Sequence, residues 1–522
     1  MPDINAQMAF PPMIRWLLAG LLFVLTACGN LSEPSSGPDN SQAVLETAFR
    51  QIDRRYAAAA SIEEMSIAGL KAVASAVPSA RLRHDMAGVA LAIEDVEVGR
   101  WPTPSAHDHV GWATVVADAI HLLQDAPSVP RPADPEASLK LFFDSALAGL
   151  DKYTRYSTPT EALNARARRD GFGGLGITIR HDDDGSYVST VHPDTPAERS
   201  GLKAGDRITH IGKTAVSTID RRAVVERLRG PVHSSVDLTV RRDAVPSPLQ
   251  FSIVRAHIIL PTVISRTEDG FLYIKISGFN QGTSRALGRS LAEAESTGAA
   301  PLKGILLDLR ANPGGLLDQA VAIADLFLND GRVISTRGRH HRANQIFDAS
   351  WGERVRGLPI ALLVNGRSAS ASEIVAAALR DRGRAIVVGT SSFGKGSVQN
   401  IIRLPNGGEL TMTWAHLIAP SGFNLQGHGV IPAICTSAGD LKLQPLMAAM
   451  RDRSAAAAGA FVRMLESRQA VRKDPEKARK DCPPTDELST GDVEIAKYIL
   501  GDRTLYARAL SDGGPAIAET RP

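Results

Sequence analysis

Between Ile258 and Cys435, short apolar runs alternate with segments of helical character. Strands are expected at Phe271–Ile276, Gly304–Leu309, Arg332–Thr336, Ile360–Val364, Ala385–Val388 and Glu409–Trp414, and helices across Ser284–Ser296, Leu316–Phe327 and Ala371–Arg380. Strands that alternate with helices are typical of an α/β layer structure. Because 522 residues are too many for one ordinary domain, we interpret this region as the α/β core of a multidomain protein.

Two short segments of this core point to chemistry. The first, Ser368–Glu373, opens an Ala-rich apolar stretch, and the second, Phe393–Gln399, holds Lys395 between two glycines. A serine hydroxyl is a poor nucleophile until an adjacent base takes its proton. A lysine is such a base only where burial lowers its pKa enough to leave it neutral. The pair therefore predicts peptide-bond hydrolysis without histidine.

Composition does not choose the nucleophile among Ser368, Ser370 and Ser372. Ser370 and Glu373 have the Ser-x-x-Glu spacing of a capping box, so an ordinary helix cap is the alternative interpretation. The two roles are compatible, because a helix N-terminus has free N–H groups and the positive end of the helix dipole. For Lys395 the alternative is an ordinary surface lysine.

The N-terminus is interpreted as a targeting segment. Arg15 precedes the apolar run Trp16–Ala27, whose twelve residues are fewer than the ~20 of a membrane-spanning helix. The run ends in small residues before Cys28, which resembles the bacterial lipoprotein signal, in which this cysteine carries the lipid. The alternative is a secretory signal that merely contains a cysteine. We expect a signal peptide over 1–27 and a flexible tether over 28–44.

These features predict an enzyme outside the cytoplasm, in the periplasm and held to a membrane by lipid. Gly29 is not the aspartate associated with inner-membrane retention, so the outer membrane is favoured. If Cys28 carries lipid, Cys435 and Cys482 remain as an even pair in an oxidising compartment. We predict a disulfide between them that ties the core to the C-terminal helices; two free thiols are the alternative.

Both ends of the mature chain are expected to be helical. The N-terminal region, 45–168, has apolar residues at helical spacing from Leu45 to Tyr56, with further helices around Trp112–Leu123 and Leu139–Leu150. In the C-terminal region, 436–522, the stretch from 463 to 481 mixes charges of both signs and is interpreted as a solvated helix face.

A β-rich region, 169–257, lies between the N-terminal region and the core. Strands are expected at Leu175–Arg180, Tyr187–Val191, Arg207–Ile211, Val236–Arg241 and Gln250–Arg255, with one helix at Arg221–Arg229. The glycine-rich segment 173–177 and the glycine-punctuated segment Thr195–Ile208 resemble those of a PDZ domain.

The PDZ resemblance implies a nest of backbone N–H groups, formed by Gly174, Leu175, Gly176 and Ile177, that binds a chain-terminal carboxylate. Leu175, Ile177 and Leu228 would line a pocket for the last side chain of the ligand. Plain core packing is the alternative for each of them. The ligand implied is a protein C-terminus that ends in apolar residues.

From Leu150 to Pro432 the chain resembles the C-terminal processing peptidases of the tail-specific protease group. The resemblance is carried by Leu150–Tyr156, the PDZ-like region, Leu307–Gly315, the serine and lysine segments, and Gly427–Pro432, in this order. The sequence departs from the family pattern at Ala433, where an acidic residue is usual, and at His233, where glycine is common.

The family resemblance implies a crotonase/Clp-protease-like core over 258–435. It places the nucleophile on Ser370, the base on Lys395 and a side chain that orients the base on Gln399, whose alternative is an ordinary strand residue. The oxyanion would bind the N–H of Ala371 and a second N–H from the Gly314–Gly315 turn, whose alternative is an ordinary β-turn.

The resulting hypothesis is a lipid-anchored serine endopeptidase that captures unfolded or C-terminally exposed protein substrates. A hinge at Gly171–Gly176 suggests that the PDZ domain gates the site, so an adaptor or activator protein is a further expected partner, and a homo-oligomer is compatible. No metal or organic cofactor is implied, and the small net charge of +3 gives no reason to propose nucleic acid.

Three alternatives stay open. The chain could be a PDZ-bearing binding protein with an inactive peptidase core, or an acyl-transfer enzyme of the crotonase-type fold that acts on a thioester. His416 and His428 leave a Ser/His peptidase open, although neither has an evident acidic partner in the sequence.

Overall fold

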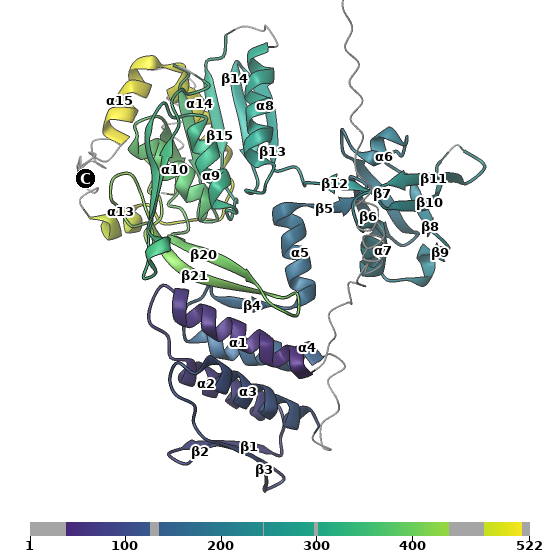
Figure 1. The fold of residues 1–522 in the computed structure, drawn as a ribbon. Coiled ribbons are helices and arrows are strands. Elements are labelled where there is room, and N and C mark those ends of the chain that lie inside the picture. The colour runs from purple at the N-terminus through teal and green to yellow at the C-terminus, as the bar shows by residue number, and fades with distance from the viewer. Residues whose placement is uncertain are drawn as a thin grey trace, which may run out of the picture.

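The computed structural model describes residues 38–125, 135–243, 245–296, 301–355, 357–437 and 474–513. Figure 1 shows an N-terminal region, an inserted β module and an α/β core, arranged around the long hairpin of β20 (Ser397–Arg403) and β21 (Glu409–Ile418). No helix in these ranges is both long and apolar enough to cross a membrane. The expected signal peptide and Cys28 lie outside the described residues.

The N-terminal region packs four helices around one apolar core. They are α1 (Pro38–Arg55), α2 (Ile62–Ser75), α3 (His109–Gln124) and α4 (Pro135–Ala148). Trp112, Phe142 and Phe143 are fully buried in this core. The helices expected around Trp112–Leu123 and Leu139–Leu150 are therefore present as α3 and α4.

Two expectations for the N-terminal region are wrong. It contains a three-stranded antiparallel sheet of β1 (Ala80–Asp85), β2 (Gly88–Ile93) and β3 (Val96–Trp101). The outer strands are rich in charged residues and largely exposed, and only two alternating apolar positions in each, Ala80 and Leu82 in β1 and Val96 and Val98 in β3, mark them as strands. The tether cannot extend to residue 44 either, because α1 begins at Pro38.

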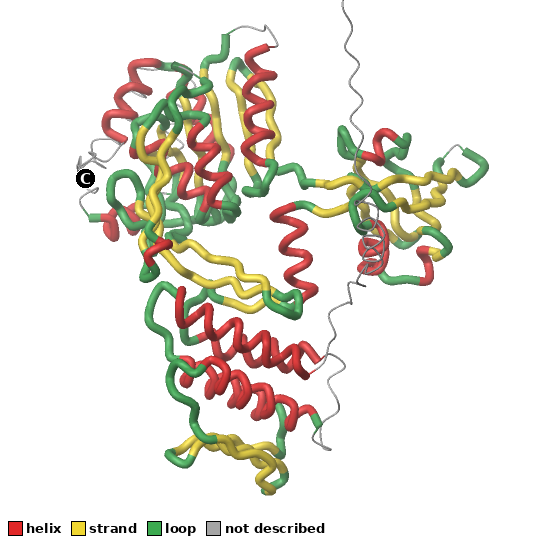
Figure 2. The backbone as a smooth tube through the Cα atoms, in the orientation of Figure 1, coloured by secondary structure: helices red, strands yellow, loops and turns green. Residues whose placement is uncertain are grey.

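The inserted module lies beside the core and is reached through β4 (Arg155–Ser157) and α5 (Pro159–Asp170) (Figure 2). Its elements are β5 (Phe172–Gly174), β6 (Ile177–Asp182), β7 (Gly185–Val191), α6 (Pro196–Arg199), β8 (Arg207–Ile211), β9 (Thr214–Ala215), η1 (Val216–Thr218), α7 (Arg221–Leu228), β10 (Ser235–Arg241), β11 (Leu249–Val254) and β12 (Ala256–Ile258). The main sheet has the order β11-β10-β8-β7-β6, which leaves β6 as an edge strand. The strands β5 and β12 pair where the chain enters and leaves the module.

The core is a six-stranded sheet covered by helices on both faces, which agrees with the expected α/β class. Its order is β13 (Val263–Glu268), β14 (Phe271–Ile276), β15 (Gly304–Asp308), β18 (Ile360–Val364), β19 (Ile386–Gly389) and β22 (Ile434–Cys435), parallel except for β13. One face packs against α8 (Thr283–Ser296), α9 (Leu317–Asp325) and α10 (Ala371–Asp381), and the other against α14 (Thr490–Gly501) and α15 (Arg503–Gly513). Strands buried on both faces are continuous apolar runs, which is why the sequence located them.

A second sheet connects the core to the N-terminal region. It contains β17 (Gln345–Ala349), β16 (Gly331–Arg337), β21 (Glu409–Ile418) and β20 (Ser397–Arg403), with η2 (His341–Ala343) between β16 and β17 and β4 paired to β21. Leu404, Leu410 and Met412 of the β20–β21 hairpin belong to the N-terminal apolar core. The hairpin therefore extends from the second sheet to the N-terminal helices, as Figure 1 shows.

The C-terminal segment returns to the core through α13 (Pro475–Asp481), whose end is joined to β22 by a disulfide between Cys435 and Cys482. Residues 438–473 lie outside the described residues, so most of the charged stretch from 463 to 481 cannot be placed. Where it is described, its interpretation as a solvated face is wrong for Arg479. The Arg479 guanidinium is half-buried and donates hydrogen bonds to backbone carbonyls of the core.

The disulfide makes a direct chemical prediction. A soluble form that begins at Asn30 contains only Cys435 and Cys482. Because both sulfurs are bonded to each other, the unfolded, non-reduced protein should take up no alkylating reagent, whereas the reduced protein should take up two equivalents. Intact-protein mass spectrometry of the two alkylated samples measures this difference. Equal uptake of reagent by the non-reduced and the reduced protein would contradict the disulfide.

Candidate active site

The first turn of α10 presents Ser370 in an unusual backbone conformation. Ser370 is the N-cap residue and has φ +54° and ψ −112°. An N-cap residue ordinarily lies in the β region, and positive φ in a non-glycine residue costs of order 1–3 kcal/mol and is concentrated at functional sites. The surrounding structure therefore has to hold Ser370 in place.

Hydrogen bonding separates the three serines that the sequence left open. The Ser368 hydroxyl donates to the carbonyl of Leu309 at 2.9 Å, and the Ser372 hydroxyl donates to the carbonyl of Asn312, also at 2.9 Å. Both serines are fully buried. Ser370 is partly exposed, and its hydroxyl donates no hydrogen bond to any described residue, so Ser370 is the serine of this segment whose hydroxyl proton is available for chemistry.

One buried carboxylate joins the serine segment to the lysine segment. Glu373 Oε2 accepts hydrogen bonds from the N–H of Ser370 at 2.7 Å and from the N–H of Lys395 at 2.9 Å. Its Oε1 accepts from the N–H of Gly394 at 2.7 Å and from the Ser392 hydroxyl. The backbone N–H groups of Ser370 and Lys395, 25 residues apart in the sequence, are thereby bound to the same carboxylate oxygen.

Sequence reasoning saw only half of this role. The Ser-x-x-Glu spacing predicted that Glu373 caps α10, and its bond to the Ser370 N–H is that cap. Its bonds to Gly394 and Lys395 span about twenty residues and leave no local signal. Burial raises the pKa of the Glu373 carboxyl, and the hydrogen bonds that it accepts oppose this rise.

Lys395 lies in a largely enclosed position above an aromatic ring. Its Nζ is 4.8 Å from the centre of the Tyr153 ring, and Lys152 lies over the same ring at 5.1 Å. Burial lowers the pKa of the Lys395 ammonium, and the positive charge of Arg155 lowers it further. The negative charges of Glu373 and Asp151 raise it. The pKa of Lys395 is lowered overall, as a lysine that acts as a base requires.

The environment of Lys395 comes from the segment Leu150–Tyr156 of the N-terminal region. Asp151 accepts hydrogen bonds from the N–H of Tyr153 at 2.7 Å and from the Thr154 hydroxyl at 2.6 Å. It also accepts from the hydroxyl of Thr413 at 3.2 Å, which ties the segment to β21. Tyr153 and Arg155 were not identified as site residues from the sequence, because only the fold brings them to the lysine.

Gln399 lies on β20, four residues after Lys395, but does not contact it by a hydrogen bond in the described part of the chain. Its amide donates to the hydroxyls of Ser397 at 3.0 Å and of Thr413 at 3.3 Å. The role of Gln399 in orienting the lysine therefore stays a prediction.

The Gly314–Gly315 turn lies directly against the serine segment. A Cβ atom on Gly314 would be 2.7 Å from the carbonyl oxygen of Ala369 and 2.9 Å from both the N of Ala371 and the Cβ of Ser370. The Gly314 N–H donates to the side chain of Asn312 at 2.9 Å. Gly314 is thus needed for the close approach, while its own N–H is already occupied, which leaves Gly315 as the better candidate donor for an oxyanion beside Ala371.

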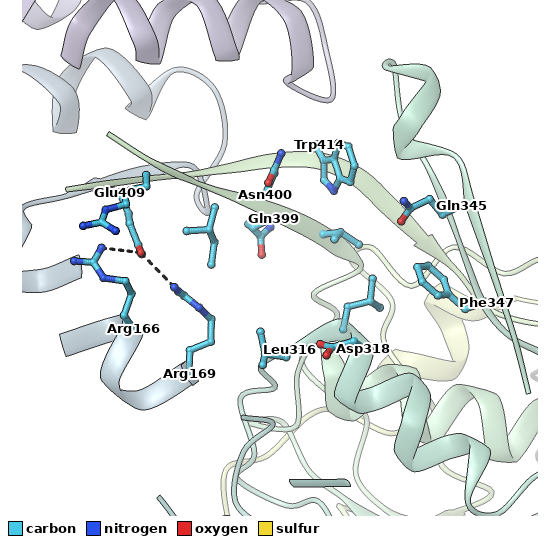
Figure 3. A pocket seen from close by; sticks show the side chains of 14 residues that line it. Arg166, Arg169, Leu316, Asp318, Gln345, Phe347, Gln399, Asn400, Glu409 and Trp414 are labelled. Atoms are coloured by element: carbon cyan, nitrogen blue, oxygen red, sulfur yellow. Dashed lines mark hydrogen bonds and ion pairs between the residues drawn. The ribbon is translucent and has the colours of Figure 1, made fainter. Parts of the chain in front are cut away.

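A groove of about 630 Å³ lies between β20, β21, α5 and the start of α9 (Figure 3), and its walls include Leu316, one residue after the glycine turn, and Val398, three residues after Lys395. Leu316, next to the glycine turn, and Gln399 lie on facing walls. At one end, the buried carboxylate of Glu409 binds both Arg166, at 3.0 Å, and Arg169, at 3.2 Å. The groove is large enough for an extended chain segment, and several apolar side chains line it.

The histidine alternative finds no support in the geometry. His428 Nδ1 pairs with the carbonyl of Gln426 at 3.0 Å, and the buried Nδ1 of His416 has no partner. Neither is hydrogen-bonded to Ser370 or to a carboxylate in the described ranges. Those ranges also contain no group of three or more potential metal ligands.

Comparison with known proteins agrees with this geometry. Residues 270–436 match the peptidase family S41, and residues 187–242 match the PDZ domain. The chain is 40% identical over 303 residues to the carboxy-terminal-processing protease of Bartonella bacilliformis, covering 58% of this chain and 70% of the relative. It is 31% identical over 313 residues to the carboxyl-terminal-processing protease of Synechocystis, covering 58% and 72%.

The chain belongs to the carboxy-terminal-processing proteases of peptidase family S41. It is a serine-type peptidase with a PDZ domain, and proteins are its class of substrate. Among solved structures, a photosystem II D1 C-terminal processing protease is similar at 23% identity, with 76% of this chain and 92% of that chain covered and a TM-score of 0.38.

The PDZ domain of this S41 peptidase presents the expected glycine loop next to its edge strand. Gly176 has φ +83°, and a Cβ atom there would lie 2.2 Å from the Thr195 side chain. The carbonyls of Leu175 and Gly176 accept from Ala197 and His192 inside the domain. No described residue accepts a hydrogen bond from the N–H groups of Leu175 or Gly176. Leu175, Ile177 and Leu228 all adjoin the apolar core of the domain.

The contact at Gly314 gives a sharp test of the glycine turn. Gly314→Ala should lower peptidase activity by about 10²–10³-fold, the loss typical of a damaged oxyanion site, because the new methyl group displaces Ala371 or Ser370. Casein cleavage at equal protein concentration measures it. Gly205→Ala is the matched control, since Gly205 has a similar φ of +93° but open space around it. Equal activities of the two variants would contradict the proposed packing.

Proposed function

We propose that this S41 peptidase is an endopeptidase that uses Ser370 as nucleophile and Lys395 as general base. The observation that carries the proposal is the shared Glu373 carboxylate, which bonds to the backbone N–H of both residues. The strained backbone of Ser370 and the lowered pKa of Lys395 support it further. The intact pair argues against a binding protein with an inactive peptidase core.

The reaction follows from these positions. Neutral Lys395 takes the proton of the Ser370 hydroxyl, and Oγ attacks the carbonyl carbon of the peptide bond. The N–H groups of Ala371 and Gly315 stabilise the oxyanion. The protonated Lys395 then gives its proton to the leaving amine, which departs and leaves an acyl-enzyme. Water, deprotonated by Lys395, hydrolyses the ester and restores Ser370.

We further propose that the PDZ domain binds substrate C-termini. The N–H groups of Leu175 and Gly176 supply donors for a carboxylate, and the open edge of β6 suits a peptide that adds as a strand. Lipid attachment at Cys28, a periplasmic location, an adaptor and a crotonase/Clp-protease-like core remain proposals that rest on the sequence. An acyl-transferase that acts on a thioester is disfavoured by the PDZ domain.

The dyad predicts a defined pattern of inactive variants. The soluble form that begins at Asn30 should degrade casein, whereas Ser370→Ala and Lys395→Arg should not, because arginine stays protonated. Activity should rise with pH as Lys395 loses its proton, below the usual lysine range because burial lowers its pKa. Substantial cleavage by Lys395→Arg would refute the base. Lys303→Arg is the control, since Lys303 lies over the remote Phe271 ring.

The PDZ proposal predicts dependence on a free carboxylate. A short peptide that ends in apolar residues should bind Ser370→Ala protein, and its C-terminally amidated form should bind much more weakly, because the nest loses its anion. Gly176→Ala should also weaken binding, while Gly185→Ala, with open space around it, should not. Isothermal titration calorimetry compares them, and equal affinities of the acid and the amide would rule out carboxylate capture.

A further inference from the structure

The segment from Asp474 to Asp492 crosses the same edge of the core that carries the active site. It begins with α13, which is only seven residues long, and ends in the first turn of α14. Along this segment, backbone and side-chain hydrogen bonds attach it to two loops of the active site. We call residues 474–492 the C-terminal strap.

The first attachment is made by Arg479 to the loop that precedes Lys395. Arg479 Nη1 donates to the carbonyl of Ser392 at 2.7 Å and to that of His428 at 2.6 Å, and Nη2 donates to the carbonyl of Phe393 at 3.1 Å. Phe393 is two residues before Lys395. A single half-buried guanidinium thus holds two successive carbonyls of the lysine loop and a third from the neighbouring loop.

The second attachment joins the strap to Asn365 and Gly366, in the loop that precedes Ser370. The N–H of Gly366 donates to the carbonyl of Thr485 at 2.7 Å, and the Asn365 amide donates to the carbonyl of Asp486 at 3.3 Å. Asn365 in turn accepts from the N–H of Ala311 at 2.8 Å, three residues before Gly314. The strap therefore supports the loops on both sides of Ser370.

The disulfide fixes the strap at the point where Arg479 acts. Cys482 ends α13 three residues after Arg479, and Cys435 lies on β22, which pairs with β19. Both cysteines are buried. Since a seven-residue helix is not stable by itself, the position of Arg479 depends on this bond and on the hydrogen bonds of the strap.

We propose that Arg479 is a positioning residue for Lys395, held in place by the Cys435–Cys482 disulfide, so that peptidase activity depends on the oxidised state of the chain. The proposal rests on the proposed role of Lys395 as base. Without Arg479, the carbonyls of Ser392 and Phe393 lose their donors and the loop loosens. Water then reaches Lys395, and a hydrated lysine holds its proton more firmly.

The test measures activation of Ser370 without a protein substrate. A fluorophosphonate probe labels an activated serine, and its second-order labelling rate is recorded from acid to alkaline pH for each variant. Arg479→Gln removes the guanidinium, Arg479→Lys keeps a cation, and the double variant Cys435→Ala/Cys482→Ala removes the disulfide alone. Lys480→Gln, an exposed neighbour on the same helix, is the matched control, and thermal melting verifies that each variant is folded.

We expect Arg479→Gln to label about tenfold more slowly near neutral pH, less than the roughly 10²–10⁴-fold loss expected for removal of the base itself. Its rise in rate should move to higher pH, so that alkaline conditions restore it. Arg479→Lys should recover part of the rate, and the cysteine variant should change in the same direction as Arg479→Gln.

Two results would overturn the inference. One is an Arg479→Gln profile equal to that of Lys480→Gln, or lowered equally at every pH, which a merely structural role would give. The other is a cysteine variant that labels like the parent, which would remove the redox dependence. If Arg479→Gln does not fold, the cysteine variant carries the test, and a pH profile of labelling equal to that of the parent overturns the inference. Failure of the dyad is seen separately, as labelling that persists in Ser370→Ala or is unchanged in Lys395→Ala.

Discussion

The proposed catalytic centre depends on one buried carboxylate that two loops share. An isolated buried carboxylate is strongly destabilised, so Glu373 is tolerable only because four donors surround it. Hydrogen bonds to a charged group contribute roughly 1.5–3 kcal/mol each. One of these bonds holds the N–H of Ser370, whose backbone conformation costs about 1–3 kcal/mol. The carboxylate thus holds the strained serine with one bond and the lysine loop with the other three.

Around this carboxylate, segments far apart in the sequence each supply one part of the site. The N-terminal region contributes Tyr153 and Arg155, whose ring and charge shape the surroundings of Lys395. The core supplies the serine helix and the glycine turn. The C-terminal strap is hydrogen-bonded to the loops that precede Ser370 and Lys395. Closing a chain of 47 residues by a disulfide removes about 4 kcal/mol of conformational freedom from the unfolded state by the chain-entropy account.

Sequence reasoning succeeded where the signal is local. The strands Phe271–Ile276 and Ile360–Val364 agree with the structure at both ends, because strands buried on both faces are unbroken apolar runs. It missed the whole sheet of β1, β2 and β3, although β2 is a buried apolar run, and it interpreted Arg479 as solvated. Glu373, Tyr153 and Arg479 act through contacts with residues at least nineteen positions away, and such contacts follow from the fold, not from spacing.

Two segments of backbone connect the PDZ domain to the rest of the chain. The chain enters through α5 and β5 and leaves through β12, and the short β5–β12 pair is the backbone link between domain and core. The helix α5 is anchored at the other side by Arg166 and Arg169, which both bind the buried Glu409 of β21. β21 also carries Thr413, which bonds Gln399 and Asp151. The ion cluster of Arg166, Arg169 and Glu409 therefore connects the helix that leads into the PDZ domain with β21, whose Thr413 binds Asp151 in the segment next to Lys395.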